Sequence, residues 1–185
     1  MPIYTKRGDG GKTGMFISGK SGKDVRVYKD SLKVRVLGSL DELNSFLGIT
    51  ISFSNMPEIT LHLKEVQKNL FTIGSIAAGS ELRFSVLQTK KLEKIIDDAE
   101  KRLPALTKFI LPGGNVFASH LHYARSVARR AERMMVALSR KEGVKPQILT
   151  YLNRLSDYLF MMARLANYNK IIEEEVWSVR NKNKT

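Results

Sequence analysis

The chain has 185 residues, of which 43% are hydrophobic and none is cysteine. This length allows one domain with a sizeable core, and the lack of cysteine excludes a disulfide framework, a cysteine-based metal site and a cysteine nucleophile. The formal net charge of +13 suits an anionic ligand, such as nucleic acid, a membrane surface or a polyphosphate, without identifying one.

We expect a cytoplasmic protein with no membrane-spanning segment. The first residues lack the apolar stretch of a signal peptide. The longest uncharged run, 109–124, is broken by Pro-Gly-Gly-Asn and is unsuited to crossing a bilayer.

The N-terminal part of the chain, 1–38, holds most of the early glycine and has little helical periodicity. Residues 4–14 read YTKRGDGGKTG, and Gly-rich loops with Lys and Thr bind phosphates through backbone N–H groups and a cation. It is not an ordinary P-loop, because Lys6 occupies the position where that loop needs a glycine. A flexible arm explains the glycine content equally well, so both interpretations stay open. The alternating residues 25–28 and 33–37 predict two short strands.

Five segments have the spacing of amphipathic helices. Ser39-Leu-Asp-Glu42 has the form of a capping box, which predicts the start of the first helix with Asp41 in its first turn. Pro57 is well placed to begin the second helix. Such helices with short connections predict an all-α fold, a five-helix antiparallel bundle behind a Gly-rich irregular segment. The predicted parts of this single domain are a phosphate-binding arm at 1–38, the bundle at 39–173, with its third helix at about 89–103 and its fifth at about 146–173, and a basic tail at 174–185.

The fourth predicted helix, at about 115–141, carries the clearest functional signal. Asn115 follows two glycines and is a good N-cap candidate. One stripe of this helix is an apolar seam, and a second stripe carries polar and charged residues. Arginine provides planar, multi-donor contact with phosphate or carboxylate, whereas lysine would serve equally well on a solvated face. We therefore favour a binding function for the second stripe, which consists of His122, Arg125, Arg129, Glu132 and Arg133.

Asn153 and Asp157 lie four positions apart within the fifth predicted helix, although both residue types are poor helix formers. They flank the apolar seam, so each side chain needs a hydrogen bond to another helix or to a ligand. We favour a ligand for Asn153 and leave both options open for Asp157. None of the three histidines has a glutamate three positions before it, which excludes the Glu-x-x-His pattern of di-iron bundles. We interpret each histidine as a surface or packing residue.

Four stretches together resemble the PduO-type ATP:cob(I)alamin adenosyltransferases. They are YTKRGDGGKTG at 4–14, DELNSFLG at 41–48, FILPGG with LHYARSVARRAER within 109–133, and NRLSDYLF at 153–160. Each motif alone is weak, but their combination in this order is highly specific and covers residues 1 to about 170. The resemblance implies a single adenosyltransferase domain, a bundle of ferritin-like topology, a homotrimer, and active sites between neighbouring subunits.

The resemblance also implies a reaction. The 5′-deoxyadenosyl group of MgATP is transferred to the cobalt of cob(I)alamin, which gives adenosylcobalamin and inorganic triphosphate. No protein side chain would bind the cobalt, and Mg²⁺ would be held by the ATP phosphates with Glu132 as a candidate neighbour. The residues matched to ATP binding are Thr5, Lys6, Arg7, Gly8, Asp9, Thr13, Gly14, Lys29, Arg129, Arg130, Glu132, Arg133 and Asn153.

The same resemblance assigns a catalytic and cobalamin-binding group. Asp41 and Arg125 match a carboxylate and an arginine that pair across the subunit boundary, and Phe109 matches an aromatic residue on the lower axial side of the corrin. Arg129 joins these three as a catalytic residue. One departure is Lys33, which replaces a frequent arginine and lacks its bidentate geometry. The partners implied are ATP, a corrinoid, a reductase and adenosylcobalamin-dependent enzymes, with no specific nucleic acid and no membrane.

Two other functions stay open from the sequence alone. A basic, nucleic-acid-binding bundle would use the same arginine stripe, although no aromatic residues are interleaved with it for base stacking. A non-catalytic, ATP-sensing trimer is compatible with the same fold, because fold does not determine function.

Overall fold

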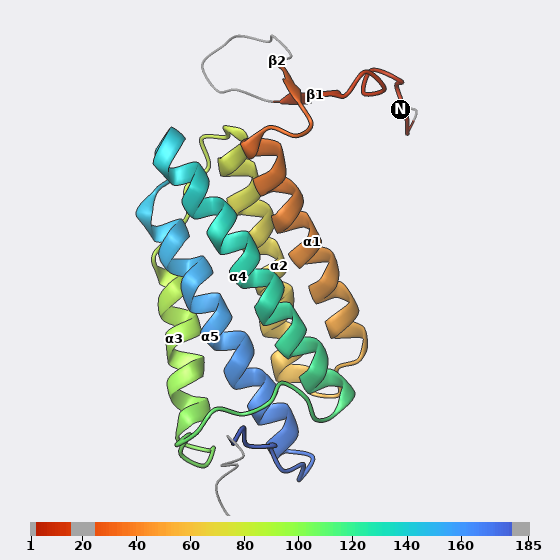
Figure 1. The fold of residues 1–185 in the computed structure, drawn as a ribbon. Helices are drawn as coiled ribbons and strands as arrows, with labels where there is room; N and C mark the ends of the chain where they lie inside the picture. Colours follow the sequence, from red (N-terminus) through yellow and green to blue (C-terminus); the bar gives the residue numbers. More distant parts are fainter. Residues whose placement is uncertain (1–2, 16–24, 179–185) are drawn as a thin grey trace, which may run out of the picture.

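The computed structural model describes residues 3–15 and 25–178, and within these ranges five helices form one bundle. Figure 1 shows that consecutive helices run in opposite directions. The helices α4 and α5 pack against each other, α1 packs on α4, α2 on α1, and α3 on α5. The predicted all-α five-helix bundle is therefore confirmed, while its ferritin-like topology stays a prediction. The helices are α1 (Leu32–Ser52), α2 (Pro57–Ala78), α3 (Leu87–Glu100), α4 (Val116–Glu142) and α5 (Pro146–Tyr168).

The ends of α2 and α4 follow local chemistry. Asn115 is the N-cap of α4, and its side-chain oxygen accepts a hydrogen bond from the Ala118 amide at 2.9 Å. Pro57 occupies the first turn of α2, where its missing N–H group costs nothing. Gly79 and Gly143 end α2 and α4 in the left-handed conformation, which glycine adopts without strain. The predicted starts of both helices are confirmed.

The predicted start of α1 was wrong. The helix begins at Leu32, so Ser39 lies inside it, where its buried hydroxyl donates to the Val36 carbonyl at 2.8 Å instead of capping. Asp41 lies in the helix interior, not in the first turn. Residues 33–37 are helical rather than a strand, because Val36 continues the four-three spacing of the α1 seam and is fully buried in the core.

A short hairpin precedes α1. The predicted strand at 25–28 is confirmed as β2 (Val25–Tyr28), which pairs antiparallel with β1 (Lys12–Met15) so that Lys12 lies opposite Tyr28. Figure 1 shows the hairpin and the preceding residues projecting beyond the end of α1. The sequence did not predict β1, because its residues combine lysine and glycine without clear alternation.

The core is formed mainly by the seams of α1, α2, α4 and α5. Residues 161–167 of α5 are all buried, since this part of the helix is covered by its neighbours and by the chain segments at the lower end of the bundle. In the described residues, no helix is both long and apolar enough to cross a membrane. The helix α5 ends at Tyr168, earlier than predicted, and the chain then folds back along the loop between α3 and α4.

Candidate functional site

An open cavity of about 340 Å³, lined by α4 and by Asn153 of α5, gathers four residues predicted to bind ATP. They are Arg129, Glu132 and Arg133 of α4 and Asn153 of α5. The Asn153 amide donates to the Glu132 carboxylate at 2.9 Å, so the two side chains orient each other. Guanidinium groups around one oriented carboxylate suit a polyphosphate together with a cation.

The same cavity contains one arginine that the sequence analysis did not select. Arg140 lies two turns beyond Arg133 on α4 and also lines the cavity. Extending the arginine stripe by one heptad would have found it. Arg130, which the resemblance matched to ATP binding, instead forms an ion pair with Glu42 of α1. The Lys33 ammonium forms an ion pair with the Glu142 carboxylate at 3.0 Å, at the C-terminal end of α4.

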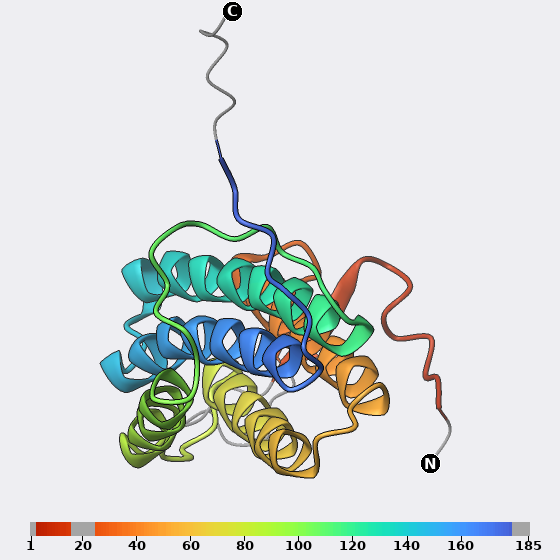
Figure 2. The same ribbon diagram turned by 90° about the horizontal axis from the view of Figure 1, so that it is seen from below.

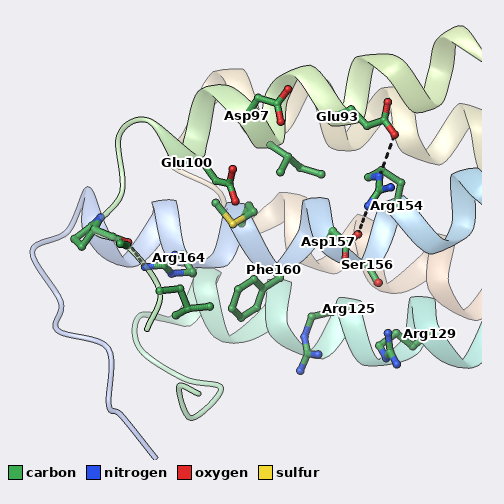
Figure 3. A pocket seen from close by; sticks show the side chains of 15 residues that line it. Glu93, Asp97, Glu100, Arg125, Arg129, Arg154, Ser156, Asp157, Phe160 and Arg164 are labelled. Atoms are coloured by element: carbon green, nitrogen blue, oxygen red, sulfur yellow. Dashed lines mark hydrogen bonds and ion pairs between the residues drawn. The ribbon is translucent and has the colours of Figure 1, made fainter. Parts of the chain in front are cut away.

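A larger groove of about 960 Å³ lies between α3, α4, α5 and the chain at 104–106. Figure 3 shows Arg125 and Arg129 on its α4 side and three acidic residues of α3 on the opposite side. Arg129 lines both this groove and the smaller cavity, so the two spaces meet at its side chain. The acidic residues of α3 are Glu93, Asp97 and Glu100.

Asp157 contacts a residue of its own helix in this structure and also lines the large groove, so a ligand contact for it stays a prediction. The Asp157 carboxylate accepts from Arg154 at 2.6 Å, and Arg154 also donates to Glu93 of α3 at 3.2 Å. The polar pair that interrupts the α5 pattern therefore has two different partners, because Asn153 contacts α4 and Asp157 is held by Arg154.

Arg125 is a partly buried charged residue of the groove. Its Nε atom is buried without a hydrogen-bond partner among the described residues. Burial, followed by the neighbouring charge of Arg129, lowers the pKa of Arg125 from its ordinary value. A partly buried guanidinium is costly unless an anion compensates it. Its predicted partner Asp41 is exposed on α1, and no ion pair joins the two within the described part of one chain.

His122 lies one turn before Arg125 and is only 3% exposed. Neither of its ring nitrogens has a hydrogen-bond partner in the described ranges, and its ring meets the Phe160 ring edge-on at 6.0 Å. Burial, and to a smaller extent Arg125, lowers the pKa of His122 to about 4. His122 is thus a packing residue, which agrees with the interpretation of the histidines but not with its inclusion in the binding stripe, and it is neutral at physiological pH.

This burial makes the stability of the fold sensitive to acid. Because the pKa of His122 is lowered from 6.5 to about 4 on folding, the unfolded chain binds a proton below pH 6.5 that the folded chain does not. The free energy of unfolding should therefore fall from about pH 6.5 to about pH 4, by up to about 3 kcal/mol from this residue. Urea unfolding of the wild type and His122→Leu at several pH values measures it. Equal pH slopes for the two proteins would contradict the prediction.

The Gly-rich segment brings its predicted residues close to one another. The Lys29 amide donates to the Gly11 carbonyl at 3.0 Å. A Cβ atom added to Gly8 would lie 3.3 Å from the Lys29 ammonium, so this lysine lies directly over the turn. The backbone turns at Lys6 and Gly11 with positive φ values of 56° and 75°.

The arm and the arginine cavity lie apart within one chain. Thr5, Lys6, Arg7, Asp9 and Gly14 are exposed, and Gly8 and Thr13 are half-buried. Figures 1 and 2 place the arm on the α1 side of the bundle, away from the α4–α5 cavity. One chain alone therefore does not bring all of the predicted ATP-binding residues together.

Phe109 lies in the loop between α3 and α4, and its side chain is 81% exposed. One end of this loop is fixed to α5 by Asn167, which donates to the Gly113 carbonyl at 3.0 Å and accepts from the Asn115 amide at 3.1 Å. Gly114 has φ +109°, and a side chain there would collide with Asn167. Asn167 was not predicted from the sequence, because no local pattern links it to Gly113 and Asn115, which lie more than fifty positions earlier.

The comparisons with known proteins agree with these features. A family model described as Cobalamin adenosyltransferase matches residues 3–166. The chain is 42% identical over 175 residues to a corrinoid adenosyltransferase of Bacillus subtilis, covering 90% of this chain and 87% of that protein. It is 39% identical to the corrinoid adenosyltransferase PduO of Citrobacter freundii, over 94% of this chain and 53% of that longer protein.

The fold gives the same result. A phenylalanine-to-histidine variant of a PduO-type ATP:corrinoid adenosyltransferase from Lactobacillus reuteri, complexed with cobalamin and ATP, superimposes with a TM-score of 0.88 and 40% sequence identity. The alignment covers 97% of each of the two chains.

Proposed function

The chain belongs to the cobalamin adenosyltransferase family, and on this premise we propose that it transfers the 5′-deoxyadenosyl group of ATP to the cobalt of a reduced corrinoid and releases triphosphate. The observation that carries the proposal is the cavity in which Arg129, Glu132, Arg133 and Asn153 converge. The family match favours this enzyme over the nucleic-acid-binding alternative.

The α4–α5 cavity supplies the chemistry that a triphosphate leaving group needs. Arg129 and Arg133 would offer guanidinium donors to the phosphate oxygens, so charge that develops on the leaving group would meet the cations that line this cavity. Asn153 keeps the Glu132 carboxylate oriented among these arginines. Preorganised contacts of this kind lower the barrier because they require no rearrangement during the reaction.

The donor set fits Mg²⁺ only together with the nucleotide. Mg²⁺ is usually bound through one or two carboxylates plus substrate phosphates, and Glu132 offers one oriented carboxylate in the cavity. The described residues include no group of three or more acidic or histidine side chains that could hold a metal by themselves. We propose that Glu132 holds Mg²⁺ that the phosphates bring with them, where it would neutralise charge on the triphosphate.

The reaction needs no general acid or base from the protein. The cobalt of cob(I)alamin is itself a strong nucleophile, which attacks C5′ of ATP and expels triphosphate. The residues of the site accordingly work by electrostatic stabilisation and by exclusion of water and ligands. The exposed ring of Phe109 offers an apolar face toward the lower side of the corrin, where it would keep axial ligands away from the cobalt.

We propose that neighbouring subunits complete each site in a homotrimer. Two observations support this: the Gly-rich arm extends away from the α4–α5 cavity of its own chain, and the Nε atom of the partly buried Arg125 has no hydrogen-bond partner within residues 3–15 and 25–178. The exposed Asp41 of a neighbouring subunit would compensate Arg125. A reductase and adenosylcobalamin-dependent enzymes are the partners that this activity requires.

Mixing two inactive variants tests the shared site. Asp41→Asn and Arg129→Ala should each be inactive alone, because each damages one half of every site. Each mixed trimer contains one site that combines the intact halves of the two variants, so the purified mixed trimers should have roughly a third of the wild-type activity. Activity per mole after purification of the doubly tagged species measures this. No recovery in verified mixed trimers would show that both residues act within one subunit.

The reaction itself is tested with chemically reduced cobalamin and MgATP under anaerobic conditions. The expected products are adenosylcobalamin, identified by its absorption spectrum, and triphosphate in equal amount. Release of ADP and phosphate without adenosylcobalamin would overturn the proposed function and favour an ATP-sensing role.

A further inference from the structure

The segment after α5 forms a small antiparallel ladder with the loop that carries Phe109. Ile110 pairs with Val176 in an antiparallel bridge. The Leu111 amide donates to the Glu175 carbonyl, and the Trp177 amide donates to the Phe109 carbonyl, both at 2.8 Å. The backbone of Phe109 is therefore held by a segment that lies more than sixty residues later in the chain.

A buried arginine of α5 anchors both sides of this ladder. Arg164 is 5% exposed, and its Nε atom donates to the Glu174 carboxylate at 2.9 Å, directly before the ladder segment. Its Nη2 atom donates to the Pro104 carbonyl at 3.0 Å, on the chain that leads toward Phe109. Figure 3 shows Arg164 at the end of the large groove, with Arg125 and Phe160 further along it.

The exposed side chain of Phe109 cannot fix its own position by packing. Its position depends on the backbone, and the Asn167 contacts secure only the far end of the loop, at Gly113 and Asn115. The part nearest Phe109 depends on the ladder. This ladder lies outside the helices and named strands, and the ion pair between Arg164 and Glu174 anchors it. If Glu174 lost its charge, the buried guanidinium of Arg164 would be left uncompensated and the segment would move to hydrate it.

We propose that Arg164 is a positioning residue of the reaction: acting through Glu174 and Pro104, it sets the place of Phe109 against the corrin. This inference rests on the proposed function of Phe109. Arg164 lines the large groove and is not among the arginines of the α4–α5 cavity. Its proposed contribution therefore concerns the cobalt end of the site and not the nucleotide end.

Glu174→Gln is the sharpest test, since it keeps the shape of the side chain and removes only its charge. We expect ATP affinity within about twofold of wild type. Turnover should fall about tenfold to hundredfold when cob(II)alamin must be reduced on the enzyme by a one-electron donor, because misplacement of a reacting group by about 1 Å costs up to about 10²-fold. The decrease should be smaller when cob(I)alamin is supplied ready-made.

A spectroscopic measurement separates positioning from mere stability. With ATP bound, the fraction of cob(II)alamin that has lost its axial ligand, read from its absorption and electron paramagnetic resonance spectra, should fall in Glu174→Gln. Arg164→Lys should lower it too, because an ammonium cannot reproduce the forked contact with Glu174 and Pro104 at once. Glu173→Gln is the matched control, since it removes the same charge from the exposed neighbouring residue, and it should behave as wild type.

The outcomes distinguish the inference from its premise. If Phe109→Ala changes the cob(II)alamin spectrum and Glu174→Gln does not, the inference about Arg164 is wrong and the role of Phe109 stands. If neither variant changes the spectrum, the proposed role of Phe109 fails. If Glu174→Gln lowers only the melting temperature, with unchanged rate and spectrum per folded molecule, the ion pair is structural alone and the inference is overturned.

Discussion

Replacing Arg129 by alanine should lower kcat/KM for ATP about 10²- to 10³-fold, the range observed when one preorganised electrostatic donor is removed from an active site. Arg129 is exposed and lines both the α4–α5 cavity and the large groove. In the proposed site, its loss removes a cation from the place where the leaving group would gain charge. Initial rates with saturating cob(I)alamin and varied ATP measure the effect.

Exposure of the side chain predicts that the Arg129→Ala variant keeps its fold. Surface substitutions usually change stability by about 0.5 kcal/mol or less. Arg83→Ala, which removes an equal charge from an exposed loop residue outside both cavities, is the matched control and should retain full activity. A folded Arg129→Ala variant with near-normal kcat/KM would show that this cavity does not bind the triphosphate.

Phe109→Ala should slow turnover about 10²-fold or more when cob(II)alamin is reduced on the enzyme, with ATP affinity nearly intact. The ring is the apolar face that would exclude water and axial ligands from the cobalt, and misplaced or missing groups at a reacting centre commonly cost this factor. The loss should be smaller when cob(I)alamin is supplied, because that step no longer depends on ligand removal. Parallel assays with the two cobalt oxidation states measure the difference.

Leu111→Ala is the control for the Phe109 experiment. Leu111 lies on the same ladder and is partly exposed, so its truncation tests whether any apolar loss in this loop has the same effect. We interpret Ile110 and Leu111 as cover for the end of the bundle, so Leu111→Ala should keep most of the activity. A Phe109→Ala variant that loses ATP binding, while its reduction-dependent rate per folded molecule is unchanged, would make Phe109 a packing residue.

The parts of this protein that sequence predicted well are those specified by local signals. The start of α4 followed from Asn115, since an N-cap is a contact between residues three positions apart. The convergence of Arg129, Glu132 and Arg133 followed from helical periodicity, because residues on one stripe of one helix share a face. Local rules also failed at α1, where Ser39 matches a capping box but the apolar seam continues past it.

The parts that sequence did not predict depend on contacts between distant residues. Arg164, Asn167 and Glu174 have no unusual local pattern, and their importance appears only when α5 lies beside the loop at 104–115. Their burial could not be inferred from residue type, since arginine, asparagine and glutamate are mostly exposed in proteins. The short strand β1 was missed for a similar reason, because its pairing with β2 and not its composition defines it.

Because α5 is one continuous helix, it also relates the proposed nucleotide and corrin sites to each other in space. Asn153 contacts the ATP cavity, and Arg164 anchors the loop of Phe109, about three helical turns and roughly 16 Å further along the same rod. If the proposed sites are correct, α5 sets the separation between nucleotide and corrin, and its nearly whole number of turns places both side chains on the same face of the helix. One inserted residue between them would rotate the far end by about 100° and lengthen the rod by about 1.5 Å. In the proposed site, the number of residues in α5 between Asn153 and Arg164 thus sets the distance between the two substrates.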